Sequence, residues 1–220
     1  MIRRHSLIAL AAGALAAGLP ASTVLLSPSL ATAQTVRTHG DTDAEMFVQN
    51  EANKVLQVLN DHSMNLTQKK QTFHALVDQV ADVPRITNFV LGRYRRSLSP
   101  QQFDAFSAVF RDYADSVYEN RLGEYSGQTL KVTGSIVRQP GDVVVSSEVM
   151  GGGKPPATVN WRVIRGQNGY RAVDVQVAGV WLAITEQQDF VSTLDNHGGN
   201  IDVLIKQLRR NTAANDAHAH

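Results

Sequence analysis

Asp174 comes closest to a catalytic arrangement, because it is the acid that stands inside a β-branched run, between Val173 and Val175. A general base of the isomerase type needs a carboxylate on an apolar cavity wall, with its pKa moved towards neutrality. Strand alternation, however, directs Asp174 away from the two valines, which favours a solvent-facing side chain or a pairing with Arg162 or Arg171. A small cavity enzyme with Asp174 as base therefore remains one alternative.

Other catalytic signatures are missing or incomplete. The patterns G-x-S-x-G, H-E-x-x-H and C-x-x-C do not occur in the sequence. The segment Gly151-Gly152-Gly153-Lys154 resembles part of a phosphate loop, but Pro155 takes the Ser/Thr position and a strand pattern follows, which favours a hairpin loop. His197 precedes a glycine at a predicted helix end, where a histidine commonly caps carbonyls. We predict no catalytic residue, no metal site and no cofactor.

The first 33 residues have the composition of an export signal. Arg3 and Arg4 form a basic start, residues 7–19 form an apolar run too short to span a bilayer, and Ala31-Thr32-Ala33 fits the rule for signal peptidase. We predict cleavage after Ala33 and leave open whether export uses the general or the twin-arginine route. The alternative is a membrane anchor, because residues 24–30 prolong the apolar character.

The remainder of the chain is cysteine-free, so its stability must come from core burial without disulfides. Removing residues 1–33 takes away two arginines and no acid, which changes the formal charge from +1 to −1. A near-neutral chain argues against nucleic acid as a partner. We predict a polar lead-in over residues 34–40, one domain over 41–210 and a disordered polar tail over 211–220.

Helical spacing of apolar residues dominates the first half of the predicted domain. Thr42 with Glu45 three residues later matches a capping box, and Ser99 with Gln102 does the same around Pro100. The predicted helices cover residues 44–59, about 67–80, 82–90 and 100–117.

The period changes to two beyond Gly127, and the second half reads as strands followed by two closing helices. Short turn sequences separate the strands, and such short connections require antiparallel neighbours. The predicted fold is α+β, with N-terminal helices packed on a twisted antiparallel sheet and C-terminal helices after it. The alternating residues are Leu130 and Val132; Val143 and Val145; Val159, Trp161 and Val163; Val173, Val175 and Val177.

Both predicted layers contain many aromatic and branched apolar side chains. Composition alone is compatible with a filled core, which would make this a purely structural envelope protein, and with a cavity. No residue pattern by itself separates the two.

Two blocks of sequence resemble the MlaC-type family, also called the toluene-tolerance family. One runs from Ala172 to Arg209, with Ala178-Gly179 between two β-branched runs and Gly198-Gly199 before the last helix; the other runs from Val83 to Tyr94. The resemblance covers roughly residues 43–209. It implies a periplasmic carrier without catalysis that moves phospholipid between an outer-membrane lipoprotein complex and an inner-membrane ABC transporter. A branch of the family is associated with hopanoid metabolism, and both branches stay open, as do the direction of transport, the lipid class, the number of acyl chains and the oligomeric state.

The resemblance also implies an apolar lipid cavity between sheet and helices. Burying each CH₂ of an acyl chain is worth ~0.8 kcal/mol, so such a cavity binds lipid without a catalytic group. The predicted cavity residues are Phe89, Val90, Tyr94, Phe106, Phe110, Tyr113, Val145, Val149, Trp161, Val163, Val175 and Trp181.

Arg93, Arg95 and Arg96 cluster at the end of the third predicted helix. Cations near a helix C-terminus favour a purely structural interpretation. The alternative is contact with a lipid phosphate or an acidic partner, which suits the guanidinium fork. Arg95 departs from the family's usual tryptophan, and Trp181 and Gln188 are further departures.

Overall fold

The computed structural model describes residues 40–119 and 127–218. The predicted signal peptide, its cleavage site and most of the polar lead-in lie outside the described residues. Within the described ranges, every helix is too short or too polar to cross a membrane.

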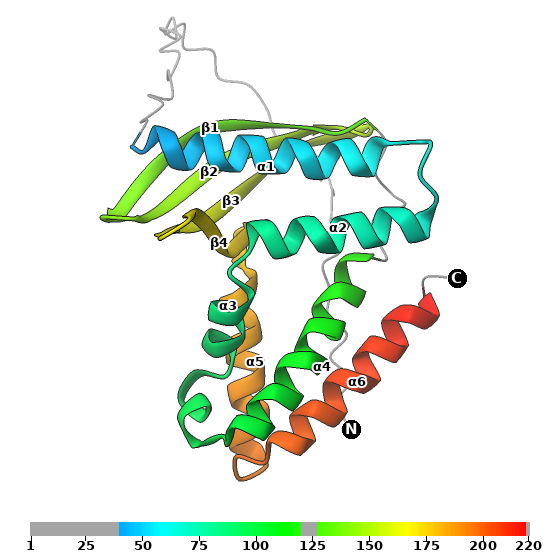
Figure 1. Ribbon diagram of the computed structural model, residues 1–220, viewed down its shortest axis with the longest axis vertical. Coiled ribbons are helices and arrows are strands. Elements are labelled where there is room, and N and C mark those ends of the chain that lie inside the picture. The colour runs from blue at the N-terminus through cyan, green and yellow to red at the C-terminus, as the bar shows by residue number, and fades with distance from the viewer. Residues whose placement is uncertain (1–39, 120–126, 219–220) are drawn as a thin grey trace, which may run out of the picture. The chain divides into compact units, whose positions relative to one another are not determined.

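The helices fall where the apolar spacing predicts them, with one additional short element (Figure 1). They are α1 (Thr42–Asn60), α2 (Leu66–Val80), α3 (Val83–Val90), the 3₁₀ helix η1 (Gly92–Ser97), α4 (Pro100–Glu119), α5 (Leu182–Asn196) and α6 (Ile201–His218).

The strands form a five-stranded sheet in sequence order, and every neighbouring pair is antiparallel. This confirms the α+β class and the predicted antiparallel sheet. The strands are β1 (Thr129–Gln139), β2 (Asp142–Gly151), β3 (Lys154–Gly166), β4 (Gly169–Val177) and β5 (Val180–Trp181).

Two separate hydrophobic clusters stabilise the fold. The helical cluster contains side chains of α3, α4, α5 and α6. At its centre Phe106 stacks on Phe110, and Phe190 packs edge-on against both. The inner-face cluster joins α1 to one face of the sheet, which we call the inner face. Its buried members are Ala44, Val48, Val143, Val145, Val163, Tyr170 and Ala172.

Of the two predicted capping boxes, one is present and the other is not. Ser99 and Gln102 form the predicted reciprocal capping bonds, at 3.2 and 3.0 Å. The predicted capping box at Thr42 is wrong, because Asp41 caps α1 by accepting from the Ala44 amide at 2.9 Å. Glu45 instead accepts a 2.7 Å bond from the Ser135 hydroxyl of β1.

The prediction of a disordered tail over residues 211–220 is wrong for residues 211–218. Helix α6 continues to His218, so residues 211–218 are helical. This extension is joined to α4, because the Asn215 side chain donates to the Ser116 hydroxyl at 3.0 Å. The arginine cluster likewise lies in η1 and not in the last turn of α3.

Candidate functional site

One end of the inner face carries apolar side chains that the fold leaves partly uncovered. Val145 pairs with Trp161 and Trp161 with Val175, so the three side chains form a row across β2, β3 and β4. Val145 has no exposed surface, whereas the other two are half-buried. The half-buried apolar residues of this face are Val132, Val149, Trp161, Val175 and Val177.

Trp161 is held in place by a short chain of hydrogen bonds. Its indole Nε1 donates to the Ser147 hydroxyl at 2.9 Å, and that hydroxyl donates to the Val159 carbonyl at 2.9 Å. Ser147 is fully buried. The polar edge of the indole is therefore satisfied inside the sheet, while its apolar ring keeps exposed surface.

Helix α1 is fixed firmly over the inner face. Ala44 and Val48 are buried in the inner-face cluster. The Gln49 side chain donates to the Leu130 carbonyl and accepts from the Val132 amide, both at 2.9 Å. This helix is therefore joined to the sheet by apolar packing and by hydrogen bonds to the β1 backbone.

Helix α2 lies beside α1 (Figure 1). Its apolar face is left partly uncovered. Phe73, Leu76, Val77 and Val80 recur at helical spacing and define one face, yet no residue of the helix is fully buried. Val80 packs against the inner-face cluster. An amphipathic helix normally buries its apolar stripe, whereas α2 leaves part of this stripe exposed to solvent.

We use the name half-buried apolar surface for these two groups together. It consists of Phe73, Leu76, Val77 and Val80 of α2 and Val132, Val149, Trp161, Val175 and Val177 of the inner face.

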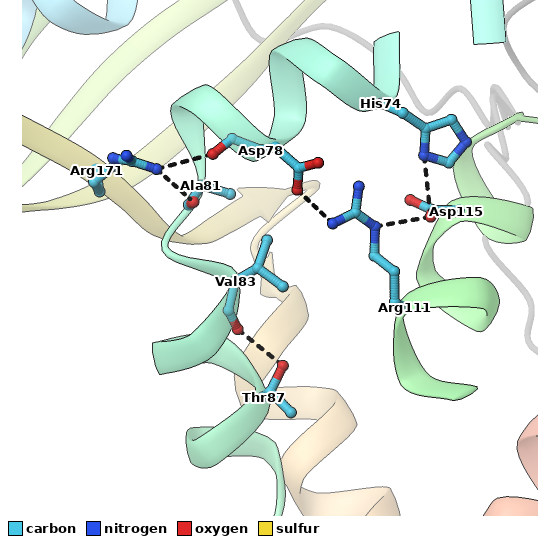
Figure 2. A network of polar contacts seen from close by, with 8 residues as sticks. All are labelled: His74, Asp78, Ala81, Val83, Thr87, Arg111, Asp115 and Arg171. Carbon is cyan, nitrogen blue, oxygen red and sulfur yellow. Dashed lines mark hydrogen bonds and ion pairs between the residues drawn. The ribbon is translucent and has the colours of Figure 1, made fainter. Parts of the chain in front are cut away.

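Charged side chains fix the polar side of α2 to α4 (Figure 2). Arg111 of α4 is paired with Asp78 of α2, and its Nε donates to Asp115 at 2.9 Å. His74 of α2 lies 3.0 Å from the same Asp115 carboxylate. The hydrogen bond from Arg111 holds the pKa of Asp78 below its ordinary value. We call these four residues the α2–α4 charge network.

The predicted cavity residues do not form a single group. Val90, Tyr94, Phe106, Phe110 and Tyr113 belong to the helical cluster or pack against it. A second group belongs to the inner face: Val145, Val149, Trp161, Val163 and Val175.

Exposure separates these residues further. Four of them, Val90, Phe106, Val145 and Val163, have no exposed surface, so in this conformation they form core. Phe89 is 37% exposed on α3.

The family model for the MlaC protein matches residues 49–210. The chain belongs to the MlaC family. It is also similar to the structure of a phospholipid-binding protein from Ralstonia solanacearum in complex with a phospholipid. The two chains share 27% sequence identity with a TM-score of 0.69, over 79% of this chain and 99% of the other.

Asp174 has a structural partner within this MlaC-family fold. It is buried on the face opposite to the inner face, and its Oδ1 accepts from the amides of Val175 and Ala183, both at 2.8 Å. The Ala183 amide belongs to the first turn of α5, whose own N-cap residue, Trp181, makes no side-chain cap bond. Burial raises the pKa of Asp174. The geometry favours a helix cap over a catalytic base.

A small pocket of about 230 Å³ adjoins Asp174. Trp181 lines this pocket. It therefore lies apart from the other predicted cavity residues of the sheet, which are on the inner face. The lining residues are Arg138, Val144, Arg162, Asp174, Trp181 and Ile184.

The predicted arginine cluster has intramolecular partners. Arg93 is paired with Asp195 of α5, and the Tyr94 hydroxyl donates to the same carboxylate. Arg95 donates to the Asn88 side chain at 2.7 Å and lies 3.8 Å from the centre of the Phe103 ring. These contacts give Arg93 and Arg95 a structural role. Contact of Arg93, Arg95 or Arg96 with a head group or partner stays a prediction.

A half-buried acid on α5 was missed by the sequence analysis. Glu186 accepts a 3.2 Å hydrogen bond from the Tyr113 hydroxyl of α4. Burial raises the pKa of Glu186 to about 7. No motif marks this residue, although its position three residues after Ala183 and four before Phe190 places it on the buried side of α5.

The α2–α4 charge network was missed as well, although the sequence contains a usable signal. His74 and Asp78 are four residues apart, as are Arg111 and Asp115, and residues at this spacing lie on one face of a helix. Two such pairs of complementary charge predict that two helices contact each other. The sequence alone does not say which helices these are.

Proposed function

We propose that this protein is a periplasmic lipid carrier that binds phospholipid at the half-buried apolar surface and performs no catalysis. The observation that carries the proposal is α2, an amphipathic helix without one buried residue beside a sheet face whose valines and Trp161 are also only half-buried. Acyl chains placed there would cover both surfaces. At ~0.8 kcal/mol per buried CH₂, two chains of about 16 carbons exchange on the order of 20 kcal/mol of water contact for protein contact.

The comparisons support the same ligand class. The Ralstonia solanacearum protein was solved with a phospholipid and matches nearly its whole length to this chain. By extension from the family, the carrier exchanges lipid between an outer-membrane lipoprotein complex and an inner-membrane ABC transporter, where the partner supplies the ATP. Export with cleavage after Ala33 belongs to this proposal, and the mass of the mature protein from a periplasmic extract tests it.

Native mass spectrometry of protein purified without detergent tests lipid binding. We expect near one phospholipid per chain, and organic extraction then identifies the lipid and separates phospholipid from a hopanoid. The variant Leu76→Lys introduces a charge into the half-buried apolar surface and should lose the lipid while the circular dichroism spectrum is kept. Gln79→Lys adds the same charge at an exposed position of α2 and is the matched control. Lipid-free wild-type protein from several mild preparations would contradict the proposal.

A further inference from the structure

Helix α2 is anchored at its two ends and has little apolar packing between them. Near its start, the Lys69 ammonium donates to the Leu59 carbonyl of α1 at 2.7 Å. Just beyond its end, the Asp82 amide donates to the Ala172 carbonyl of β4 at 2.9 Å. Arg171 of β4 donates to the Asp78 and Ala81 carbonyls, at 2.9 and 3.3 Å (Figure 2).

The α2–α4 charge network is a further restraint, which acts on His74 in the middle of the helix and on Asp78 near its end. Its side chains range from exposed to mostly covered, with 55% of Asp78, 28% of His74, 27% of Arg111 and 16% of Asp115 accessible to solvent. Exposed ion pairs are weak and are screened by salt. Separation of α2 from α4 exposes no fully buried side chain of α2, because every residue of this helix is at least partly exposed.

The other helix beside the half-buried apolar surface does not have this freedom. Moving α1 would expose Ala44 and Val48 and break both hydrogen bonds between Gln49 and β1. Of the two helices, α2 can therefore move at lower cost.

We propose that α2 is the wall of the lipid site that moves to admit and release lipid, and that Arg111 is the positioning residue that holds it closed through Asp78, while Asp115 of α4 orients the guanidinium. The inference rests on the proposed function, because it assigns a regulation to the same site. Arg111 does not touch lipid in this account. It sets the rate of lipid exchange by fixing the position of α2.

Transfer of a fluorescent phospholipid from loaded protein to acceptor vesicles measures that rate. Arg111→Gln removes the pair with Asp78, which is the ion pair of the guanidinium that crosses from α4 to α2. We expect transfer about 2- to 5-fold faster, in line with the loss of one weak pair. The lipid content by native mass spectrometry should stay near the wild-type value. Arg111→Lys keeps a charge without the planar fork and should give an intermediate rate.

Two further variants separate positioning from general destabilisation. Asp78→Asn should also accelerate transfer, and its effect should not add to that of Arg111→Gln, since both break the same contact. Lys54→Gln is the matched control, because it breaks an exposed pair with Glu51 on α1, at 2.8 Å, and leaves α2 untouched. Its transfer rate should equal that of the wild type.

Hydrogen–deuterium exchange of residues 66–80 reads the motion of α2 without any lipid. Faster exchange in Arg111→Gln, confined to this helix, is the expected result. If wild-type protein carries lipid but Arg111→Gln changes neither α2 exchange nor transfer, the inference is overturned and the carrier function stands. If α2 exchange rises in protein that never binds lipid, the motion stands and the proposed function fails.

Discussion

Helices α1 and α2 lie side by side and have similar apolar patterns, but the fold holds them in different ways. Four residues of α1 are buried, among them Ala44, Val48 and Leu59, and Gln49 is hydrogen-bonded to β1. No residue of α2 is buried, and the charged or polar side chains of His74 and Asp78 join it to α4. An apolar stripe in a sequence therefore identifies a helix that covers apolar surface, but it does not say whether the protein or a ligand supplies that surface.

The comparison is tested most severely by placing the same charge on each helix. Val48→Asp buries a carboxylate at a site that is 3% exposed, so we expect the free energy of unfolding to fall by at least about 3 kcal/mol. Val77→Asp on α2 places the carboxylate at a half-buried site and should cost less than about 1 kcal/mol while abolishing lipid binding. Urea unfolding of both variants, with native mass spectrometry, measures the two effects. Equal destabilisation would show that α2 is as firmly packed as α1.

The dependence of stability on pH tests Glu186, which lies between α4 and α5, and not the contact between Arg111 and Asp78 that holds α2. Because the folded pKa of Glu186 is raised from 4.5 to about 7, the folded state binds more protons than the unfolded state between these values. Stability is then lost as the pH rises from about 4.5 through about 7, by on the order of 2 kcal/mol. Asp78 has a lowered pKa, so it stays ionised throughout this range.

Glu186→Gln keeps an acceptor for the Tyr113 hydroxyl and removes the titration. We expect the variant to lose less stability than the wild type between pH 5 and pH 8, by chemical denaturation at each pH. Parallel pH profiles for the two proteins would contradict the assignment of this dependence to Glu186.

The smallest predicted effect compares the caps of the two helices. Asp41 caps α1 and also accepts a 2.6 Å hydrogen bond from the Tyr170 hydroxyl, which is the main cause of its lowered pKa. Asp41→Ala should lower global stability by about 1–2 kcal/mol. Asn65 forms a capping box with Gln68 on α2, and Asn65→Ala should mainly accelerate hydrogen exchange in α2, with a global cost below about 0.5 kcal/mol. A similar global loss for both variants would remove the distinction between the helices.

Periodicity predicted the order and type of the main helices and strands because each element has one apolar face. Local motifs were less reliable. The capping-box pattern is present at Thr42, but Glu45 bonds to Ser135, a partner 90 residues away in sequence. Composition was also misleading beyond residue 210, where polar residues suggested disorder although Asn215 is joined to α4. Contacts distant in sequence decided both cases.

The candidate site was harder to predict than the fold. Alternation correctly placed Trp161 and Val175 on one sheet face, but it gave Val145 the same status, and Val145 is fully buried in the cluster that joins α1 to the sheet. Strand pattern reports which face a residue is on, and only tertiary packing reports what lies above it. The same limit applies to the apolar face of α2, whose pattern is that of an ordinary core helix.

The bonds from Gln49 to Leu130 and Val132 have a consequence for association between copies of the chain. β1 is the outermost strand at one side of the sheet, and an open outer strand is a template for strand addition and aggregation. Gln49 occupies backbone groups that an incoming strand would use, and the Asn60 side chain donates to the Gln128 carbonyl nearby. At the opposite side, β5 is only two residues long. Both borders of the sheet are thus poor templates for cross-β growth, although the protein keeps apolar surface half-buried.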